Sequence, residues 1–187
     1  MNRPMTKFAA LLLAMSPVAA TALAGGGASA ATPHHVVEHM RLITGKMDGK
    51  PGWPKITNSS WTVHKGQVVT VQIVSFDDGS APLMGKYMTY ANVKGTLNHK
   101  ELVNGKAVAS VSDINVAHTF TVAGLGFNMP IPVAATGGHV VVTASFVANK
   151  TGTFTWNCYA PCGSGTNGMA GAMSTMGWMT GKVTVIG

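Results

Sequence analysis

Short runs of β-branched and aromatic residues limit what this chain can fold into more than any other feature. Residues 68–74 read VVTVQIV and residues 140–146 read VVVTASF, which is strand-like in both length and composition. Similar runs recur further along the chain, at 61–63, 108–111, 116–122, 153–156 and 182–186. Turn signals built from Gly, Asp, Asn and Pro separate them. The pattern predicts an all-β fold, a Greek-key β-sandwich or barrel.

The first 30 residues have the composition of an export signal. Arg3 and Lys7 precede the apolar run 8–15, and Ala28-Ser29-Ala30 provides an A-x-A cleavage site. If retained, the uncharged stretch 8–30 is long enough to anchor the chain in a bilayer. We expect an exported protein, periplasmic or extracellular, with cleavage favoured over an N-terminal anchor.

Three parts are expected along the chain. A signal at 1–30 is followed by a polar segment at 31–53 and one β domain at 54–187. Within the polar segment, Val36, Val37, Met40 and Ile43 are spaced for one or two helical turns. The residues that remain after the signal are numerous enough to build one domain with its own core.

Charge and motif content exclude several function classes. The formal net charge is +7, but its 13 Lys and Arg residues are scattered rather than clustered, so nucleic acid is a poor candidate partner. Only six carboxylates occur, and the chain has no G-x-S-x-G, H-E-x-x-H or phosphate-binding glycine loop. We do not expect the chain to be an enzyme on its own.

Four residues form a candidate metal constellation. His118 lies within the strand-like run 116–122, and Cys158, Cys162 and Met169 lie in the stretch WNCYAPCGSGTNGM. The last strand-like run follows this stretch. Imidazole, thiolate and thioether groups together suit copper. Nine of the 12 methionines come after residue 30, and four of these lie between 169 and 179, where an apolar patch for docking is one interpretation.

A strand histidine followed by a cysteine–methionine loop ahead of the last strand resembles the cupredoxin superfamily. Within it, the C-x3-C spacing, His118-Thr119-Phe120 and the segment FNMPIP at 127–132 resemble the binuclear copper domain of cytochrome c oxidase subunit II. The resemblance implies a cupredoxin-like Greek-key fold over 54–187. It also implies one or two copper ions held by His118, Cys158, Cys162 and Met169.

The sequence departs from that family at Thr166, where the family has its second histidine ligand. A further donor could then come from outside the motif, and the candidates are His34, His35, His64, His99, His139, Met173 and Met176. If the alignment is right, the variant Thr166→His should move the copper spectrum toward the mixed-valence binuclear type.

The resemblance implies electron transfer with a redox partner such as a cytochrome or a terminal oxidase, and a role as the electron-accepting part of an oxidase-type complex. Two alternatives remain open. One is a Cu(I)-handling or chaperone protein that holds the ion without redox cycling. The other is a metal-free structural domain in which Cys158 and Cys162 form a disulfide.

Overall fold

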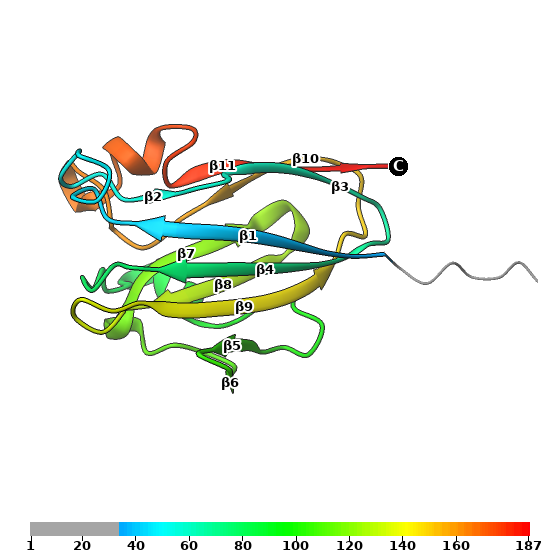
Figure 1. Cartoon of the computed structure of the whole chain (residues 1–187), viewed down its shortest axis with the longest axis horizontal. Helices are drawn as coiled ribbons and strands as arrows, with labels where there is room; N and C mark the ends of the chain where they lie inside the picture. The colour runs from blue at the N-terminus through cyan, green and yellow to red at the C-terminus, as the bar shows by residue number, and fades with distance from the viewer. Residues whose placement is uncertain (1–33) are drawn as a thin grey trace, which may run out of the picture. The chain divides into compact units, whose positions relative to one another are not determined.

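The computed structural model describes residues 34–187, which form two β-sheets packed face to face (Figure 1). One sheet has the strand order β2-β1-β4-β9-β5-β6 and the other β3-β11-β10-β7-β8. The predicted all-β sandwich is confirmed.

The strands are β1 His35–Ile43, β2 Lys55–Ile56, β3 Ser60–His64, β4 Val68–Ser75, β5 Glu101–Val103, β6 Lys106–Val108, β7 Val116–Val122, β8 Phe127–Pro132, β9 Val140–Val147, β10 Gly152–Asn157 and β11 Thr180–Ile186. The 3-10 turns are η1 Gly85–Ala91, η2 Asp113–Asn115, η3 Ala123–Leu125, η4 Thr166–Gly168 and η5 Gly171–Ser174.

Strand pairing brings distant parts of the chain together. β1 runs parallel to β4 and β3 runs parallel to β11, while the other paired strands are antiparallel. The side chains of Val69, Val71 and Ile73 on β4 are fully buried between the sheets, where alternation with period two places them. The second sheet adds the large rings of Phe120 and Trp156 to this core.

The segment around Val36 and Ile43 differs from its predicted helical turns. Residues 35–43 form strand β1, which pairs with β4 along its length from His35↔Val68 to Leu42↔Ser75. Met40 and Leu42 alternate into the core with period two, so burial against the sheet overrides the helix-compatible spacing. The sandwich therefore includes residues before position 54, and the domain boundary predicted there is wrong. The expected signal, 1–30, lies outside the described residues.

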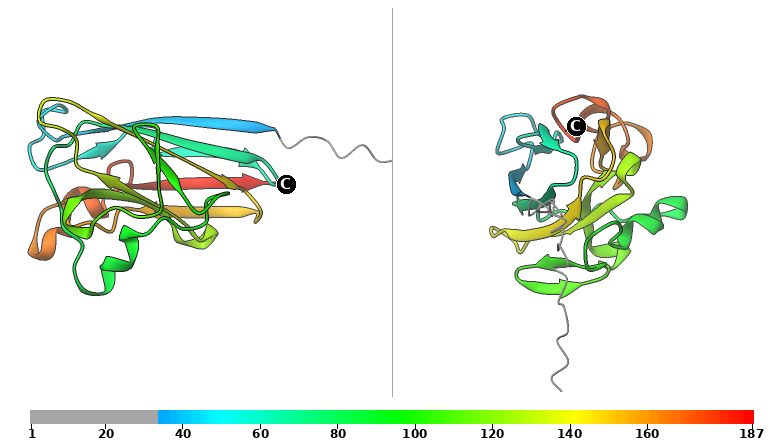
Figure 2. Two further views of the ribbon diagram at one scale, coloured as in Figure 1. Left: turned by 90° about the horizontal axis from the view of Figure 1, so that it is seen from below. Right: turned by 90° about the vertical axis from the view of Figure 1, so that its right-hand side faces the viewer.

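Three segments gather at one end of the sandwich. The loop after β1, the turn after β4 and the long connection between β10 and β11 lie there, away from the C-terminus (Figures 1 and 2). Trp53 from the first loop meets Trp178 from the long connection edge-on, with ring centroids 5.1 Å apart. The Lys50 ammonium lies 3.2 Å from the Trp53 ring centroid and reinforces the contact. Among the helices of the described residues, none has the length and apolar character needed to cross a membrane.

Candidate metal centre

Three of the predicted ligands converge at this end of the sandwich. His118 lies in β7 and Cys158 directly follows β10; both are buried, whereas Cys162 is partly exposed. The Cys158 Sγ atom lies 4.0 Å from His118 Nδ1 and 3.4 Å from Cys162 Sγ. The ligand atoms of all three residues fall within 4.8 Å of one another. Atoms that share one metal ion at roughly 2.0–2.3 Å are separated by about 3–4.5 Å, so these three can bind a common ion.

Backbone hydrogen bonds hold Cys158 against β7. The Thr119 amide donates to Cys158 Sγ at 3.3 Å, and the Tyr159 amide donates to Thr119 Oγ1 at 2.9 Å. Cys158 also lies next to the β10–β7 pairing at Asn157↔Thr121. Both cysteines are free thiols, and their 3.4 Å sulfur separation is well beyond a disulfide bond of about 2.05 Å.

Asp77 orients the His118 ring. Its Oδ2 atom lies 2.8 Å from His118 Nε2, while its Oδ1 accepts the Gly79 amide at 2.9 Å. Nε2–H therefore donates to the carboxylate, and Nδ1 faces the Cys158 sulfur. A carboxylate behind a histidine ligand is a frequent support of metal sites because it fixes the tautomer and the ring direction. The sequence indicated only a turn at Asp77-Asp78-Gly79. The one available signal was that Asp77 is one of just six carboxylates and directly follows a buried strand.

The sulfur closest to the thiols is that of Met173. Its Sδ atom lies 3.1 Å from Cys162 Sγ, and the residue is only 7% exposed. Met173 was one of several candidates for a further donor. Met169, the methionine at the family spacing, instead lines a hollow of about 340 Å³ together with Tyr87, Tyr159 and Asn167.

The histidines considered as further donors lie elsewhere. His64 and His99 are exposed, and exposed His139 packs its ring on Phe76 at 5.7 Å. His35 contacts Thr70 Oγ1 at 2.6 Å, while His34 is exposed. Within residues 34–187, the group of possible His, Cys and carboxylate ligands contains His118, Cys158 and Cys162.

Met176 is 51% exposed, whereas Met179 is buried in the core, so the later methionines do not form one exposed patch.

Hydrogen bonds within the centre outweigh the effect of burial on its charges. Burial lowers the pKa of His118, but Asp77 and Cys158 raise that pKa to about 9. Burial also raises the pKa of the Cys158 thiol, but Cys162 and His118 bring it well below its ordinary value. The hydrogen bond to Cys158, together with burial, raises the pKa of Cys162. The metal-free centre therefore pairs an imidazolium with a thiolate that is hydrogen-bonded by the second thiol. Metal binding has to displace these protons.

The connection between the two sulfur ligands folds back on itself. The Gly163 amide donates to the Gly168 carbonyl at 2.8 Å, and Ser164 and Ala170 exchange two backbone hydrogen bonds. Gly168 has φ of 64°, and a Cβ atom there would collide with the Pro161 carbonyl oxygen, so glycine is needed at this position. Thr166 lies exposed at the tip of this closed turn.

No family model and no curated protein matches this chain. Among solved structures, auracyanin A, a "blue" copper protein from Chloroflexus aurantiacus, is 15% identical over 81% of this chain and 98% of its own, with a TM-score of 0.36. Rusticyanin from Thiobacillus ferrooxidans is 16% identical over 80% of this chain and 77% of its own, with a TM-score of 0.37. A multicopper oxidase from Campylobacter jejuni is 10% identical over 83% of this chain and 31% of its own, with a TM-score of 0.41.

At these low identities and TM-scores the neighbours carry no argument about the fold or the site. Both therefore depend on the residues of this chain. The donor set passes a simple chemical test for copper. Zinc sites use cysteine, histidine and carboxylate ligands, whereas a thioether beside two thiols is a soft set typical of copper, above all Cu(I). His118, Cys158, Cys162 and Met173 are the residues that fit the ion.

Proposed function

We propose that this protein is a cupredoxin-type copper protein that transfers electrons. One observation carries the proposal: an oriented imidazole nitrogen and two thiols lie within 4.8 Å of one another at the end of the β-sandwich, with the Met173 thioether against the Cys162 thiol. Copper, when bound, supplies a one-electron couple. The chain supplies the four donors and holds them by strand pairing and hydrogen bonds, so that the ligand positions change little between oxidation states.

A stack of tyrosines favours electron transfer over simple storage. Tyr159, the neighbour of Cys158 in the chain, lies with its ring centroid 4.1 Å from that of Tyr90, at an interplanar angle of 10°. The Tyr87 ring also stacks on Tyr159, with ring centroids 6.1 Å apart, and both Tyr87 and Tyr90 are partly exposed. The aromatic groups thus connect the Cys158 side of the centre with the protein surface.

The relation to cytochrome c oxidase subunit II is part of this proposal. It is supported by the C-x3-C pair, whose sulfurs can face a common metal, and by His118-Thr119-Phe120. The missing second histidine at Thr166 and the approach of Met173 favour a site rebuilt around sulfur. We propose that the site holds one copper ion, and that the partner is a redox protein such as a cytochrome or a terminal oxidase. Export to the periplasm or cell exterior is proposed from the composition of residues 1–30.

A second function is favoured by the sulfur content of the site. Three sulfur donors and one nitrogen stabilise Cu(I) relative to Cu(II), which suits a protein that carries Cu(I) without cycling it. The two functions differ in whether the bound ion can be oxidised and reduced reversibly while it remains in place.

Copper reconstitution separates these functions. The reduced, metal-free protein is loaded with copper, and its copper count, visible spectrum, EPR spectrum and voltammetry are recorded. A reversible couple with a thiolate-to-copper band supports electron transfer, and a mixed-valence spectrum supports the binuclear type. A colourless Cu(I) complex that releases copper on oxidation supports the handling role. Protein that binds no copper with both thiols free contradicts both functions.

A matched pair of methionine variants tests the ligand assignment. Loss of an outer-shell partner weakens metal binding by about 10–100-fold, so loss of a direct ligand in Met173→Leu should weaken Cu(I) binding by at least about tenfold. Leucine keeps the packing volume, which limits structural disturbance. Met169→Leu is the control and should leave the affinity unchanged in a chelator competition. The opposite ranking would assign the thioether ligand to Met169, as the family spacing predicts.

A further inference from the structure

A cavity beside the centre opens onto only one of its two thiols. It has a volume of about 630 Å³, and its walls include Cys162 but not Cys158. Cys162 is also the more exposed of the two sulfurs, since Cys158 and His118 are almost fully buried. An ion that approaches from solvent through this cavity therefore meets Cys162 before the other ligands.

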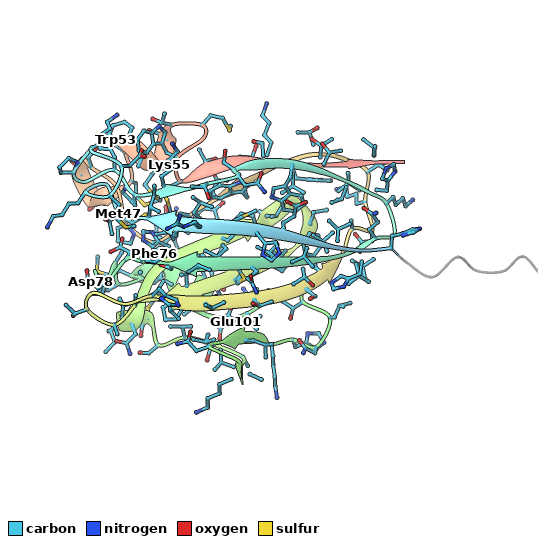
Figure 3. The ribbon with its side chains drawn as sticks, in the orientation of Figure 1. Met47, Trp53, Lys55, Phe76, Asp78 and Glu101 are labelled. Atoms are coloured by element: carbon cyan, nitrogen blue, oxygen red, sulfur yellow. The ribbon has the colours of Figure 1, made fainter. Side chains whose placement is uncertain are left out.

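The cavity also presents a second sulfur at its mouth. Met47 lies on the loop after β1, lines the cavity and is 52% exposed, so packing does not explain its presence there. Figure 3 shows Met47, Phe76 and Asp78 at the end of the sandwich that carries the metal centre. A thioether is a neutral soft ligand that binds Cu(I) without having to lose a proton.

Acidic residues line the cavity although the whole chain is basic. Two of the six acidic residues, Asp77 and Asp78, line it together with Lys46, whereas the chain carries +7 overall. Asp77 pairs with the His118 imidazolium at 2.8 Å, so its charge is already balanced. Asp78 is exposed, so its carboxylate is free to attract a cation from solution.

From these observations we infer that the cavity is the route by which Cu(I) reaches the centre. This inference rests on the proposed copper-binding function. Met47 takes the ion from its carrier at the mouth, Asp78 favours the cation inside, and Cys162 is the first thiol to bind it. The transfer is a ligand exchange with no change of oxidation state: a sulfur–copper bond to Cys162 forms, the bond to Met47 breaks, and the thiol proton leaves to water in the cavity.

Loading kinetics test the route. Reduced, metal-free protein is mixed in a stopped-flow instrument with Cu(I) supplied as its cationic acetonitrile complex, and the ultraviolet thiolate-to-Cu(I) absorption reports loading. Met47→Leu should slow loading severalfold, and Asp78→Asn should slow it by about three- to tenfold through lost electrostatic attraction. The final Cu(I) affinity, measured separately by equilibrium competition with bicinchoninate, should remain that of the unmodified protein, because neither residue belongs to the final ligand set.

Two matched controls address sulfur content and charge. Met84→Leu removes an exposed methionine that lines the other hollow, and Asp113→Asn removes a carboxylate outside the cavity. Both should load at the rate of the unmodified protein. If Met47→Leu and Asp78→Asn load at that rate too, or if the controls slow as much, the route is refuted while copper binding stands. A fall in equilibrium affinity equal to the fall in rate would also refute it. If the unmodified protein takes up no copper, the proposed function fails as well.

Discussion

Glu101 provides a sharp test of the energetics of the sandwich. It lies at the start of β5, is 1% exposed, and neither carboxylate oxygen has a hydrogen-bond partner among the described residues. A buried carboxylate without partners is destabilised in its charged form. Burial accordingly raises the pKa of Glu101 from its ordinary value of 4.5 to about 9. At neutral pH the folded protein therefore keeps a proton that the unfolded chain has released.

The sign and size of the effect follow from proton linkage. Because the pKa is higher in the folded state than in the unfolded state, stability is lost as the pH rises from 4.5 toward 9. From pH 4.5 to neutrality the loss extends over about 2.5 pH units, and at 1.36 kcal/mol per unit it reaches about 3 kcal/mol. Glutamine has nearly the same shape and does not titrate. The unfolding free energy of Glu101→Gln minus that of the unmodified protein should therefore depend on pH. This difference should be about 3 kcal/mol larger at pH 7 than at pH 4.5.

Urea unfolding of both proteins at several pH values between about 4.5 and 8, followed by tryptophan fluorescence, measures this difference. A chelator and a reductant keep the metal centre metal-free and its thiols free. Other titrating groups occur in both proteins, so their contributions cancel in the comparison. A difference in unfolding free energy that stays constant across this pH range would refute the reasoning, because it would mean that Glu101 titrates alike in the folded and unfolded states.

Three further substitutions have definite expected outcomes. Asp77→Asn removes the charge that orients His118 and should weaken Cu(I) binding by about 10–100-fold in a chelator competition, with the fold retained by circular dichroism. Gly181→Ala places a Cβ against the Ser59 carbonyl oxygen and should destabilise the fold by roughly 1–3 kcal/mol in urea unfolding, whereas Gly187→Ala, in open space, should have no effect. Thr166→His should leave the copper spectrum unchanged, contrary to the expectation from family spacing, and a shift toward the mixed-valence type would show that the loop rearranges.

The strands with local signals were predicted well. Residues 68–75, 116–122 and 140–147 carry their own β-branched composition, so composition and turn signals identify them without knowledge of their partners. Strand β1 was not identified because Val36, Met40 and Ile43 also suit a helix. Its conformation is decided by parallel pairing with β4, a contact that connects His35 with Val68 and leaves no local trace in the sequence.

In the metal centre, too, residues with local sequence signals were predicted, whereas a residue that depends on a long-range contact was missed. The predicted His118, Cys158 and Cys162 come together because His118 lies in β7 and Cys158 directly follows β10, two strands with fixed positions in one sheet. Cys162 follows Cys158 in the adjoining loop. Asp77 was missed because its contact with His118 joins positions 41 residues apart. Nothing in a two-residue acidic turn indicates which histidine will face it.

The course of the loop after Cys162 bears on the ligands that family spacing predicts there. Spacing assigns ligands at 166 and 169 only if the chain continues around the metal, but hydrogen bonds between Gly163 and Gly168 and between Ser164 and Ala170 close it into a separate turn. Thr166 is exposed at the tip of that turn, and the ends of the loop bring Cys162 and Met173 together. We propose these two as ligands, while Met169 remains the thioether that family spacing predicts. Replacing an imidazole by a thioether softens the donor set and favours Cu(I) over Cu(II). A site with Thr166 in place of a second histidine is therefore consistent with the Cu(I) loading route that we propose through the cavity beside Cys162.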